Sequence, residues 1–228
     1  PSIVPGLDPA LGVDAYTLKT EEKTTRIIGG DPAGVLYGAY RYVEMLGVRF
    51  YLHGDVVPDE RLATLPSVDE TGAPLFAIRG IQPFHDFPEG PDWWNEEEYK
   101  AILSQLPKMR MNFFGLHTYP ENRPNAEPTV WIGLERDFTS DGSVWQSYPS
   151  SYQNTLRGNW GYTAKKTSDY TFGADLLFEF DAFGPDVMGT SLPSPTTPEA
   201  SNNVFKRTGR MLREAFSHAR RLGVKTCV

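Results

Sequence analysis

The stretch that decides the fold is Met111-Asn112-Phe113-Phe114-Gly115-Leu116, an almost continuous apolar run that ends at His117-Thr118-Tyr119. Strands that are buried on both faces of a parallel sheet have this composition. A strand is also predicted over 76–84 and another begins at 224–228, and helical periodicity separates the three. The order strand, helix, strand, helix, strand predicts a parallel α/β sheet, either doubly wound or the beginning of a (β/α)8 barrel.

Two helices are predicted between these strands. The first follows Asn95, a favourable N-cap, and Glu98 stands where the partner of a capping box belongs. Pro107 removes a helical N–H group, so we expect this helix to end or kink there. The second helix begins at Thr197-Pro198-Glu199. The residues at about 120–197 are too many for a structureless loop in a compact domain, so they are interpreted as an ordered insertion.

The first 70 residues predict a separate small α+β layer, with one helix packed on a sheet. Apolar and polar residues alternate in its strands, and Asp31 with Pro32 is typical of a helix start. Gly29-Gly30 precedes that helix without a third Gly or a Gly-Lys-Ser/Thr, which excludes a phosphate loop. The predicted elements are strands over 14–20, 24–28 and 48–52 and a helix from Pro32 to Gly47.

Composition excludes several classes of protein. The chain of 228 residues carries 29 acidic and 22 basic side chains, a net charge of −7, which argues against binding to nucleic acid or to anionic lipid. No apolar run approaches the roughly 20 residues that span a bilayer. The single cysteine, Cys227, excludes an internal disulfide and a zinc site built from cysteines.

Polar and aromatic residues cluster where the predicted strands end. In parallel α/β folds the working residues lie at the carboxyl ends of the strands. Aromatic rings cover the C–H faces of a pyranose, while carboxylates, His and Arg bond its hydroxyl groups. This composition predicts a sugar site with the candidate residues His85, Asp86, Trp93, Trp94, His117, Tyr119 and Glu121.

Several segments resemble glycoside hydrolases. Gly34-Val35-Leu36-Tyr37-Gly38-Ala39-Tyr40 and Leu46-Gly47-Val48-Arg49-Phe50-Tyr51 resemble a small domain that precedes the barrel in β-N-acetylhexosaminidases of family 20 and α-glucuronidases of family 67. Residues 74–80 and 108–117 look like the stretches around the first two barrel strands of the hexosaminidases. The resemblance covers most of residues 14–119 and the last helix. It implies that Arg79 takes the place of an arginine that binds the terminal sugar.

The resemblance also implies a domain plan. Residues 1–70 would form the small domain, without the strand and helix that usually precede the Tyr16 strand. Residues 71–228 would form the first three βα units of an incomplete (β/α)8 TIM barrel. The catalytic Asp-Glu pair of the hexosaminidases follows their fourth strand, so its counterpart is expected beyond Val228. The chain is therefore interpreted as an amino-terminal fragment, with a natural apolar tail as the alternative. His117-Thr118-Tyr119 departs from the hexosaminidase pattern, which leaves the sugar open.

The function implied is hydrolysis of O-glycosyl bonds in a polysaccharide or glycoconjugate, hexosaminidase-like or α-glucuronidase-like. Carbohydrate is the expected partner, no cofactor, metal, nucleic acid or membrane is expected, and the fragment alone is expected to be inactive. A secreted or periplasmic location is implied by the resemblance alone. The alternatives are a non-catalytic carbohydrate-binding protein on the same scaffold, and a doubly wound α/β enzyme, whose glycine-rich phosphate turn is missing.

Each candidate residue also has a structural interpretation. His85 and His117 would need a third ligand to hold a metal, so hydrogen-bonded packing competes with contact to a sugar. Trp93 and Trp94 are either a sugar platform or packing at the rim of the barrel. The remaining alternatives are an ion pair at a strand end for Arg79 and solvated loop carboxylates for Asp86 and Glu121.

Overall fold

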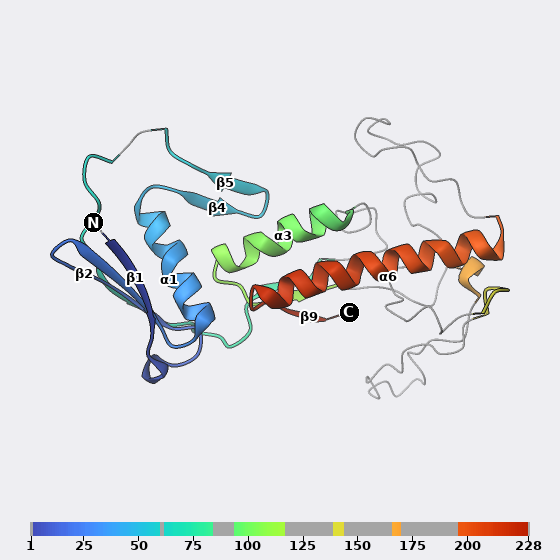
Figure 1. Cartoon of the computed structure of the whole chain (residues 1–228), viewed down its shortest axis with the longest axis horizontal. Helices are drawn as coiled ribbons and strands as arrows, with labels where there is room; N and C mark the ends of the chain where they lie inside the picture. Colours follow the sequence, from blue (N-terminus) through green and yellow to red (C-terminus); the bar gives the residue numbers. More distant parts are fainter. Residues whose placement is uncertain are drawn as a thin grey trace. The chain divides into compact units, whose positions relative to one another are not determined.

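The computed structural model describes residues 2–59, 62–83, 94–116, 139–143, 166–169 and 196–227 (Figure 1). The chain divides into two compact units. The first comprises residues 1–81, 100–114 and 218–226, and the second comprises 82–99, 115–217 and 227–228. Most of the predicted insertion at about 120–197 lies outside the described residues.

A four-stranded sheet forms the amino-terminal part of the first unit, in the order β1-β3-β2-β6. Strand β1 (Ser2–Leu7) runs parallel to β3 (Thr24–Gly29), and a short 3-10 turn, η1 (Pro9–Leu11), follows it. Strand β2 (Tyr16–Glu21) is antiparallel to both β3 and β6 (Asp69–Gly72). The hairpin of β2 and β3 agrees with the sequence prediction to within two residues.

Strand β1 corrects the expectation that no strand precedes the Tyr16 strand. Pro5 and Gly6 interrupt its pattern and most of its side chains are exposed, so no alternation reveals it. The N–H groups of Ser2 and Asp8 donate to the β3 side, at 2.9 Å from Lys23 O and Gly29 O. Backbone groups alternate along a strand, so the odd-numbered position of Pro5 faces the open edge of the sheet.

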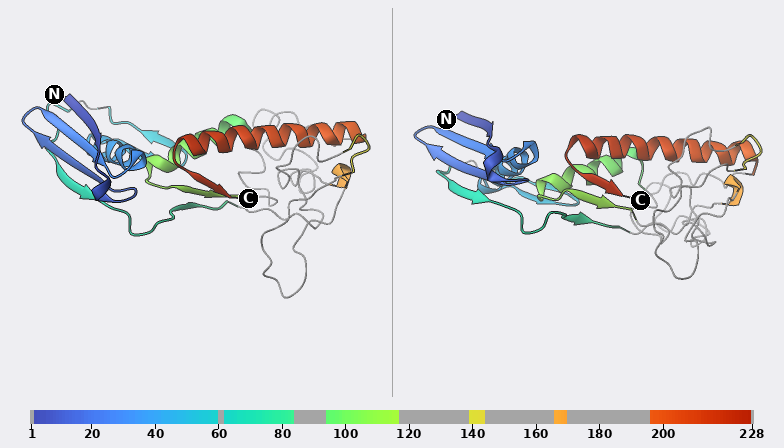
Figure 2. Two further views of the ribbon diagram at one scale, coloured as in Figure 1. Left: turned by 60° about the horizontal axis from the view of Figure 1, so that its bottom comes forward. Right: turned by 90° about the horizontal axis from the view of Figure 1, so that it is seen from below.

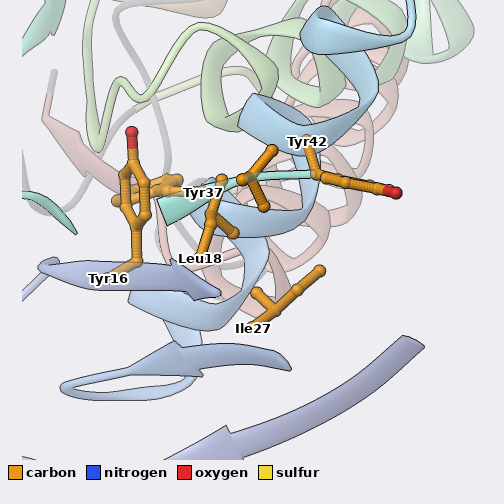
Figure 3. Packing of buried hydrophobic residues seen from close by; sticks show 6 residues of the cluster. Tyr16, Leu18, Ile27, Tyr37 and Tyr42 are labelled. Atoms are coloured by element: carbon orange, nitrogen blue, oxygen red, sulfur yellow. The ribbon is translucent and has the colours of Figure 1, made fainter. Parts of the chain in front are cut away.

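Helix α1 (Pro32–Met45) packs on one face of this sheet (Figure 2). Asp31 is its N-cap, and the Asp31 Oδ1 atom accepts from the Gly34 N–H at 2.7 Å. Figure 3 shows the core between helix and strands, where tyrosine and aliphatic side chains meet. The buried members of this core are Tyr16, Leu18, Ile27, Tyr37, Tyr42 and Val68.

The Gly29-Gly30 pair is used for close packing of backbones. A Cβ atom on Gly30 would lie 1.7 Å from Gly12 O, and one on Gly29 would lie 2.2 Å from Val35 N. Any side chain at either position would displace a neighbouring backbone segment. The pair therefore has a structural reason that is independent of any ligand.

The prediction that residues 48–52 complete the small sheet is wrong. Strand β4 (Arg49–Tyr51) pairs with β5 (Gly54–Val56) in a separate antiparallel hairpin, and β6 joins the sheet instead. The Phe50 ring packs edge-on against Tyr40 of α1, 5.3 Å between centroids. The carboxylate of Asp55 lies 2.6 Å from Lys108 Nζ. The hairpin is thus fixed by side chains rather than by the sheet.

Three further strands form a sheet in the order β7-β8-β9. Strands β7 (Gly80–Ile81) and β8 (Phe113–Gly115) are parallel, with Gly80 opposite Phe113. Strand β9 (Lys225–Cys227) joins β8 through Lys225 N to Asn112 O and Leu116 N to Cys227 O, both 2.8 Å. Residue numbers rise together across these two bonds, so β9 is also parallel to β8. The predicted mixed α/β architecture is therefore confirmed, although β7 is far shorter than the predicted strand at 76–84.

Helix α3 (Glu96–Lys108) connects β7 to β8, and its predicted capping box is confirmed. Asn95 Oδ1 accepts from the N–H groups of Glu97 and Glu98 at 2.9 and 3.0 Å, and Asn95 N–H donates to Glu98 Oε2 at 2.7 Å. The helix ends one residue after Pro107, as expected from the missing N–H group.

Helix α6 (Pro198–Arg221) precedes β9. Thr197 Oγ1 accepts from the Ala200 N–H at 3.1 Å, which places the predicted cap. Gly223 follows the helix at φ +77°, the left-handed conformation that glycine adopts readily at a helix end. His218 of α6 is half-buried, and its Nε2 atom lies 2.8 Å from Ser104 Oγ of α3.

The described parts of the second unit include a small hydrogen-bonded cluster around Asn202 of α6. Asn202 Oδ1 accepts from Thr167 Oγ1 at 2.7 Å, and Asn202 Nδ2 donates to Thr139 O at 2.8 Å. Thr167 belongs to the 3-10 turn η4 (Thr167–Asp169). Within the ranges that the structure describes, no helix is long and apolar enough to cross a membrane.

Candidate functional site

Two of the eight candidate site residues, Arg79 and Trp94, lie among the described residues. The structure places these two residues in different surroundings. The other six lie outside the described residues: His85, Asp86, Trp93, His117, Tyr119 and Glu121.

Arg79 directly precedes β7, at the amino end of that strand. Its guanidinium donates from Nε to Arg110 O at 2.8 Å, from Nη1 to Phe76 O at 2.7 Å, and from Nη2 to Asp14 Oδ2 at 2.8 Å. The side chain is only 17% exposed, and its guanidinium carbon lies 5.7 Å from the centre of the Tyr37 ring. Three of the five N–H groups of an arginine are thus used within the protein.

Asn112 shares the carboxylate of Asp14 with Arg79. Asn112 Nδ2 donates to Asp14 Oδ2 and to Ala77 O, both at 2.9 Å. Asn112 Oδ1 accepts from the Arg79 N–H at 3.0 Å. Sequence reasoning missed this residue, although a polar side chain inside the apolar run at 111–116 was a usable signal, because a buried amide requires partners.

Asp14 completes what we name the Asp14–Arg79–Asn112 cluster. Its backbone is in the left-handed region, at φ +60°, and its N–H donates to Asp31 Oδ2 at 3.1 Å. Its side chain is 9% exposed. One carboxylate therefore binds two donors in an almost dry setting, which makes it a holder of strand ends rather than an available acid or base.

The location of this cluster matters for the prediction on Arg79. Parallel α/β folds place their chemistry at the carboxyl ends of strands, whereas the cluster lies at the amino ends of β7 and β8. The described contacts of Arg79 are those of an ion pair at a strand end. Contact of Arg79 with a sugar stays a prediction.

A second polar network lies beside the cluster in the first unit. Arg41 of α1 binds both oxygens of Glu70 in β6, at 2.8 and 3.0 Å, and Arg110 binds Glu44 of α1 at 3.0 Å. The Arg41 hydrogen bonds lower the pKa of the Glu70 carboxyl. Burial, followed by the charge of Glu70, raises the pKa of Tyr16, whose hydroxyl donates to Glu70 at 3.3 Å.

The Tyr37 side chain lies beneath the guanidinium of Arg79. Burial raises the pKa of Tyr37 to about 12, and the negative charge of Asp14 contributes in the same direction. The Tyr37 hydroxyl donates to Met111 O at 3.4 Å. Tyr37 is therefore held neutral and protonated, which suits a packing role beneath a charged pair.

Trp94 ends the segment that connects β7 to α3. Its ring is half-buried and meets the buried Tyr99 ring edge-on, with 5.2 Å between centroids and 86° between planes. This geometry is favourable for aromatic pairs and holds the Trp94 ring in one orientation. Trp94 is the candidate residue that the structure describes on a β-to-α connection, where sugar-binding residues are expected.

No group of three or more His, Cys, Asp or Glu side chains is arranged to hold a metal ion within the described ranges. The polar clusters described above pair their acids with arginines or amides.

No protein family model and no curated protein matches this chain. Among solved structures, it is similar to a GH138 enzyme targeting pectin rhamnogalacturonan II, at 13% identity and a TM-score of 0.48, over 98% of this chain and 24% of that one. It is similar to a β-N-acetylhexosaminidase at 14% identity and a TM-score of 0.45, over 98% of this chain and 34% of that one.

A third solved structure is the β-N-acetylhexosaminidase from Bacteroides fragilis, at 18% identity and a TM-score of 0.41, over 57% of this chain and 22% of that one. The chain thus spans between about a fifth and a third of the length of these three proteins.

Proposed function

We propose that this chain is part of a glycoside hydrolase that cleaves O-glycosyl bonds in a polysaccharide or glycoconjugate, in a hexosaminidase-like or α-glucuronidase-like manner. The observation that carries the proposal is the arrangement of β7, β8 and β9. They are parallel, adjacent and in sequential order, and they follow a small α+β layer in the chain. That layer carries the motifs at 34–40 and 46–51 that resemble glycoside hydrolases.

The arrangement suits the beginning of a (β/α)8 barrel, in which each strand lies beside the next one in the chain. In this proposal residues 1–70 are the small domain and 71–228 are the first three βα units of the barrel. A doubly wound sheet can share this beginning, but it binds its ligand through a glycine-rich turn after the first strand. Gln82-Pro83, which follow β7, do not provide such a turn.

The sugar site of this proposal lies on the connections that leave the carboxyl ends of β7 and β8. Arg79 precedes β7 and binds Asp14, so its contact with a sugar is proposed on the resemblance alone. Trp94 offers a ring that Tyr99 holds in place, as a sugar platform requires. The proposed substrate-binding residues are Arg79, His85, Asp86, Trp93, Trp94, His117, Tyr119 and Glu121.

Hydrolysis needs two carboxyl groups, separated by roughly 5 to 9 Å, or one carboxyl group and help from the substrate. The resemblance places the principal acid on a later strand than the three present here. In this proposal the chain supplies substrate binding, and a protein ending at Val228 binds sugar without cleaving it.

The test is an assay of the complete natural gene product on chromogenic β-N-acetylglucosaminides and on glucuronic-acid-capped xylo-oligosaccharides. We expect cleavage of one of these substrate classes, and at least a tenfold lower kcat/KM for Trp94→Ala. Phe76→Ala is the matched control, because Phe76 is an exposed aromatic residue ahead of β7. Sugar binding by calorimetry without any cleavage would contradict the hydrolase and favour a non-catalytic carbohydrate-binding protein.

A further inference from the structure

Asn112 joins the amino ends of all three parallel strands. It directly precedes β8, and its N–H donates at 2.7 Å to the carbonyl of Arg79, which directly precedes β7. Its carbonyl accepts at 2.8 Å from Lys225, the first residue of β9. Its side-chain amide adds bonds to the Arg79 N–H and to Ala77 O. The backbone of Asn112 therefore bonds to the starts of β7 and β9, its side chain adds bonds to the β7 side only, and the residue is 6% exposed.

Asp14 ties the same point to the small layer. Its Oδ2 atom accepts from both Arg79 and Asn112, at 2.8 and 2.9 Å. Its own N–H is held by Asp31, the residue that caps α1. The segment before β2, the start of α1 and the starts of β7 and β8 are thus joined through consecutive hydrogen bonds.

The backbone is strained on both sides of the Arg79 guanidinium. Asp14 and Arg110, which bind its Nη2 and Nε groups, have φ values of +60° and +61°. Left-handed conformations are uncommon for residues other than glycine, and they persist where surrounding contacts hold them. Asp14 and Arg110 are two of the three such residues in the part of the chain that the structure describes.

Stability alone does not explain a charged cluster here, because apolar side chains of similar size are often as stable as a buried ion pair. The cluster instead specifies the register of the strands, since its bonds form together in only one alignment. A shift by one residue would turn every side chain of a strand to the opposite face. We propose that the Asp14–Arg79–Asn112 cluster is a register-setting site, through which the small layer positions the amino ends of β7 and β8.

In this proposal Asp14, Arg79 and Asn112 are positioning residues, which act through the alignment of the strands. The proposal does not depend on the proposed hydrolase function, because it concerns the alignment of strands. It is tested by hydrogen exchange with mass spectrometry, which follows the segments 109–116 and 16–29 of one sample separately.

The diagnostic variant is Asn112→Asp, which keeps the shape of the side chain. It replaces the Nδ2 donor by an acceptor that faces the Asp14 carboxylate and Ala77 O. We expect exchange in 109–116 to become at least tenfold faster while exchange in 16–29 changes less than twofold. Leu18→Ala is the matched control, because it weakens the core of the same unit without touching the cluster. It should accelerate exchange in 16–29 at least as much as in 109–116.

The reciprocal exchange Asp14→Asn with Asn112→Asp restores one amide donor and one carboxylate acceptor between the two positions, while the bond to Ala77 O stays lost. We expect partial recovery, with exchange in 109–116 at least threefold slower in the double variant than in Asn112→Asp, including the case in which Asn112→Asp alone does not fold. The proposal is overturned if Asn112→Asp accelerates both segments alike, as a merely structural residue would. It is also overturned if the double variant shows no recovery.

Discussion

Arg79 and Asp14 illustrate, at the residue scale, how an ion pair becomes indispensable once it is buried. Their side chains are 17% and 9% exposed, so both charges have lost most of their water. The attraction between two such charges roughly repays this loss while both are present. Removing one partner leaves the other charge buried, and the cost then falls on the folded state alone.

The change Arg79→Met tests this. We expect the free energy of unfolding to fall by about 3 kcal/mol, because the Asp14 carboxylate would keep Asn112 but lose its counter-charge. Urea denaturation followed by circular dichroism measures the change. The control is Lys19→Met, since the Lys19–Glu21 pair is more than half exposed on both sides and should contribute nothing measurable. Equal effects of the two substitutions would contradict the interpretation.

Tyr37 predicts a specific loss of stability at alkaline pH. Burial raises its pKa to about 12 in the folded protein, whereas an unfolded tyrosine titrates near the ordinary value of 10.0. Between these two values the unfolded state gives up a proton that the folded state retains, so stability falls as pH rises. Below pH 10 the contribution of Tyr37 is complete.

Tyr37→Phe removes that proton while keeping the ring under Arg79. Urea midpoints measured at pH 9 and at pH 11 should therefore differ less in the variant than in the original protein. Other tyrosines and the lysines titrate in both proteins, so only the difference between the two is informative. An identical pH dependence would show that Tyr37 titrates normally.

At the element scale, helices are predictable from sequence and short strands are not. The starts of α1 and α3 depend on caps within four residues, and these local signals are correct. Strand β1 gives no alternating pattern, because it contains Pro5 and most of its side chains are exposed. Strand β7 has only two residues. The alternation of apolar and polar residues does not predict which sheet β4 joins. The contacts that hold its hairpin come from Tyr40 and Lys108, elsewhere in the chain.

The candidate site shows the same limit at longer range. Arg79 was predicted to be important, but the partners that define its surroundings, Asp14 and Asn112, were not. Asp14 is 65 residues from Arg79 and 98 from Asn112 in the chain. Periodicity and spacing report on neighbours in sequence, so they carry no signal of such contacts.

The N-cap residue of α1 both caps its helix and binds a distant backbone N–H group, whereas the side-chain oxygen of the α3 N-cap residue only caps its helix. Asp31 uses Oδ1 for Gly34 and Oδ2 for the N–H of Asp14, whereas Asn95 uses one oxygen for the α3 cap. Serine is as good an N-cap as these residues but offers a single oxygen. We therefore expect Asp31→Ser to lower the free energy of unfolding by about 1 kcal/mol more than Asn95→Ser does. Chemical denaturation of both variants measures this, and equal losses would mean that the bond to Asp14 contributes nothing.

At the scale of the whole molecule, net charge and exposed apolar surface act together. The chain carries −7 at pH 7 and its isoelectric point is near 5.2. Three neighbouring side chains ahead of β7 are strongly exposed, Leu75 at 94%, Phe76 at 71% and Ile78 at 62%. Contiguous apolar surface promotes association once charge repulsion is gone.

We therefore expect self-association of this chain to peak near pH 5.2 and to fall on either side. The double change Leu75→Ser with Phe76→Ser should lower light scattering at that pH several-fold. Val13→Ser serves as the control, since Val13 is 76% exposed but lies outside this segment, and single exposed apolar residues are common in proteins. Equal scattering from the double variant and the original protein would exclude the segment as the cause.

The position of Pro5 in β1 has a consequence for growth of the sheet beyond this molecule. A strand from another copy that paired with β1 would find the outward N–H groups of Ile3 and Leu7, but no N–H group at Pro5 between them. A template with a gap in its middle is a poor primer for fibrils. The proline ring thus weakens pairing along the β1 edge without any element that covers it.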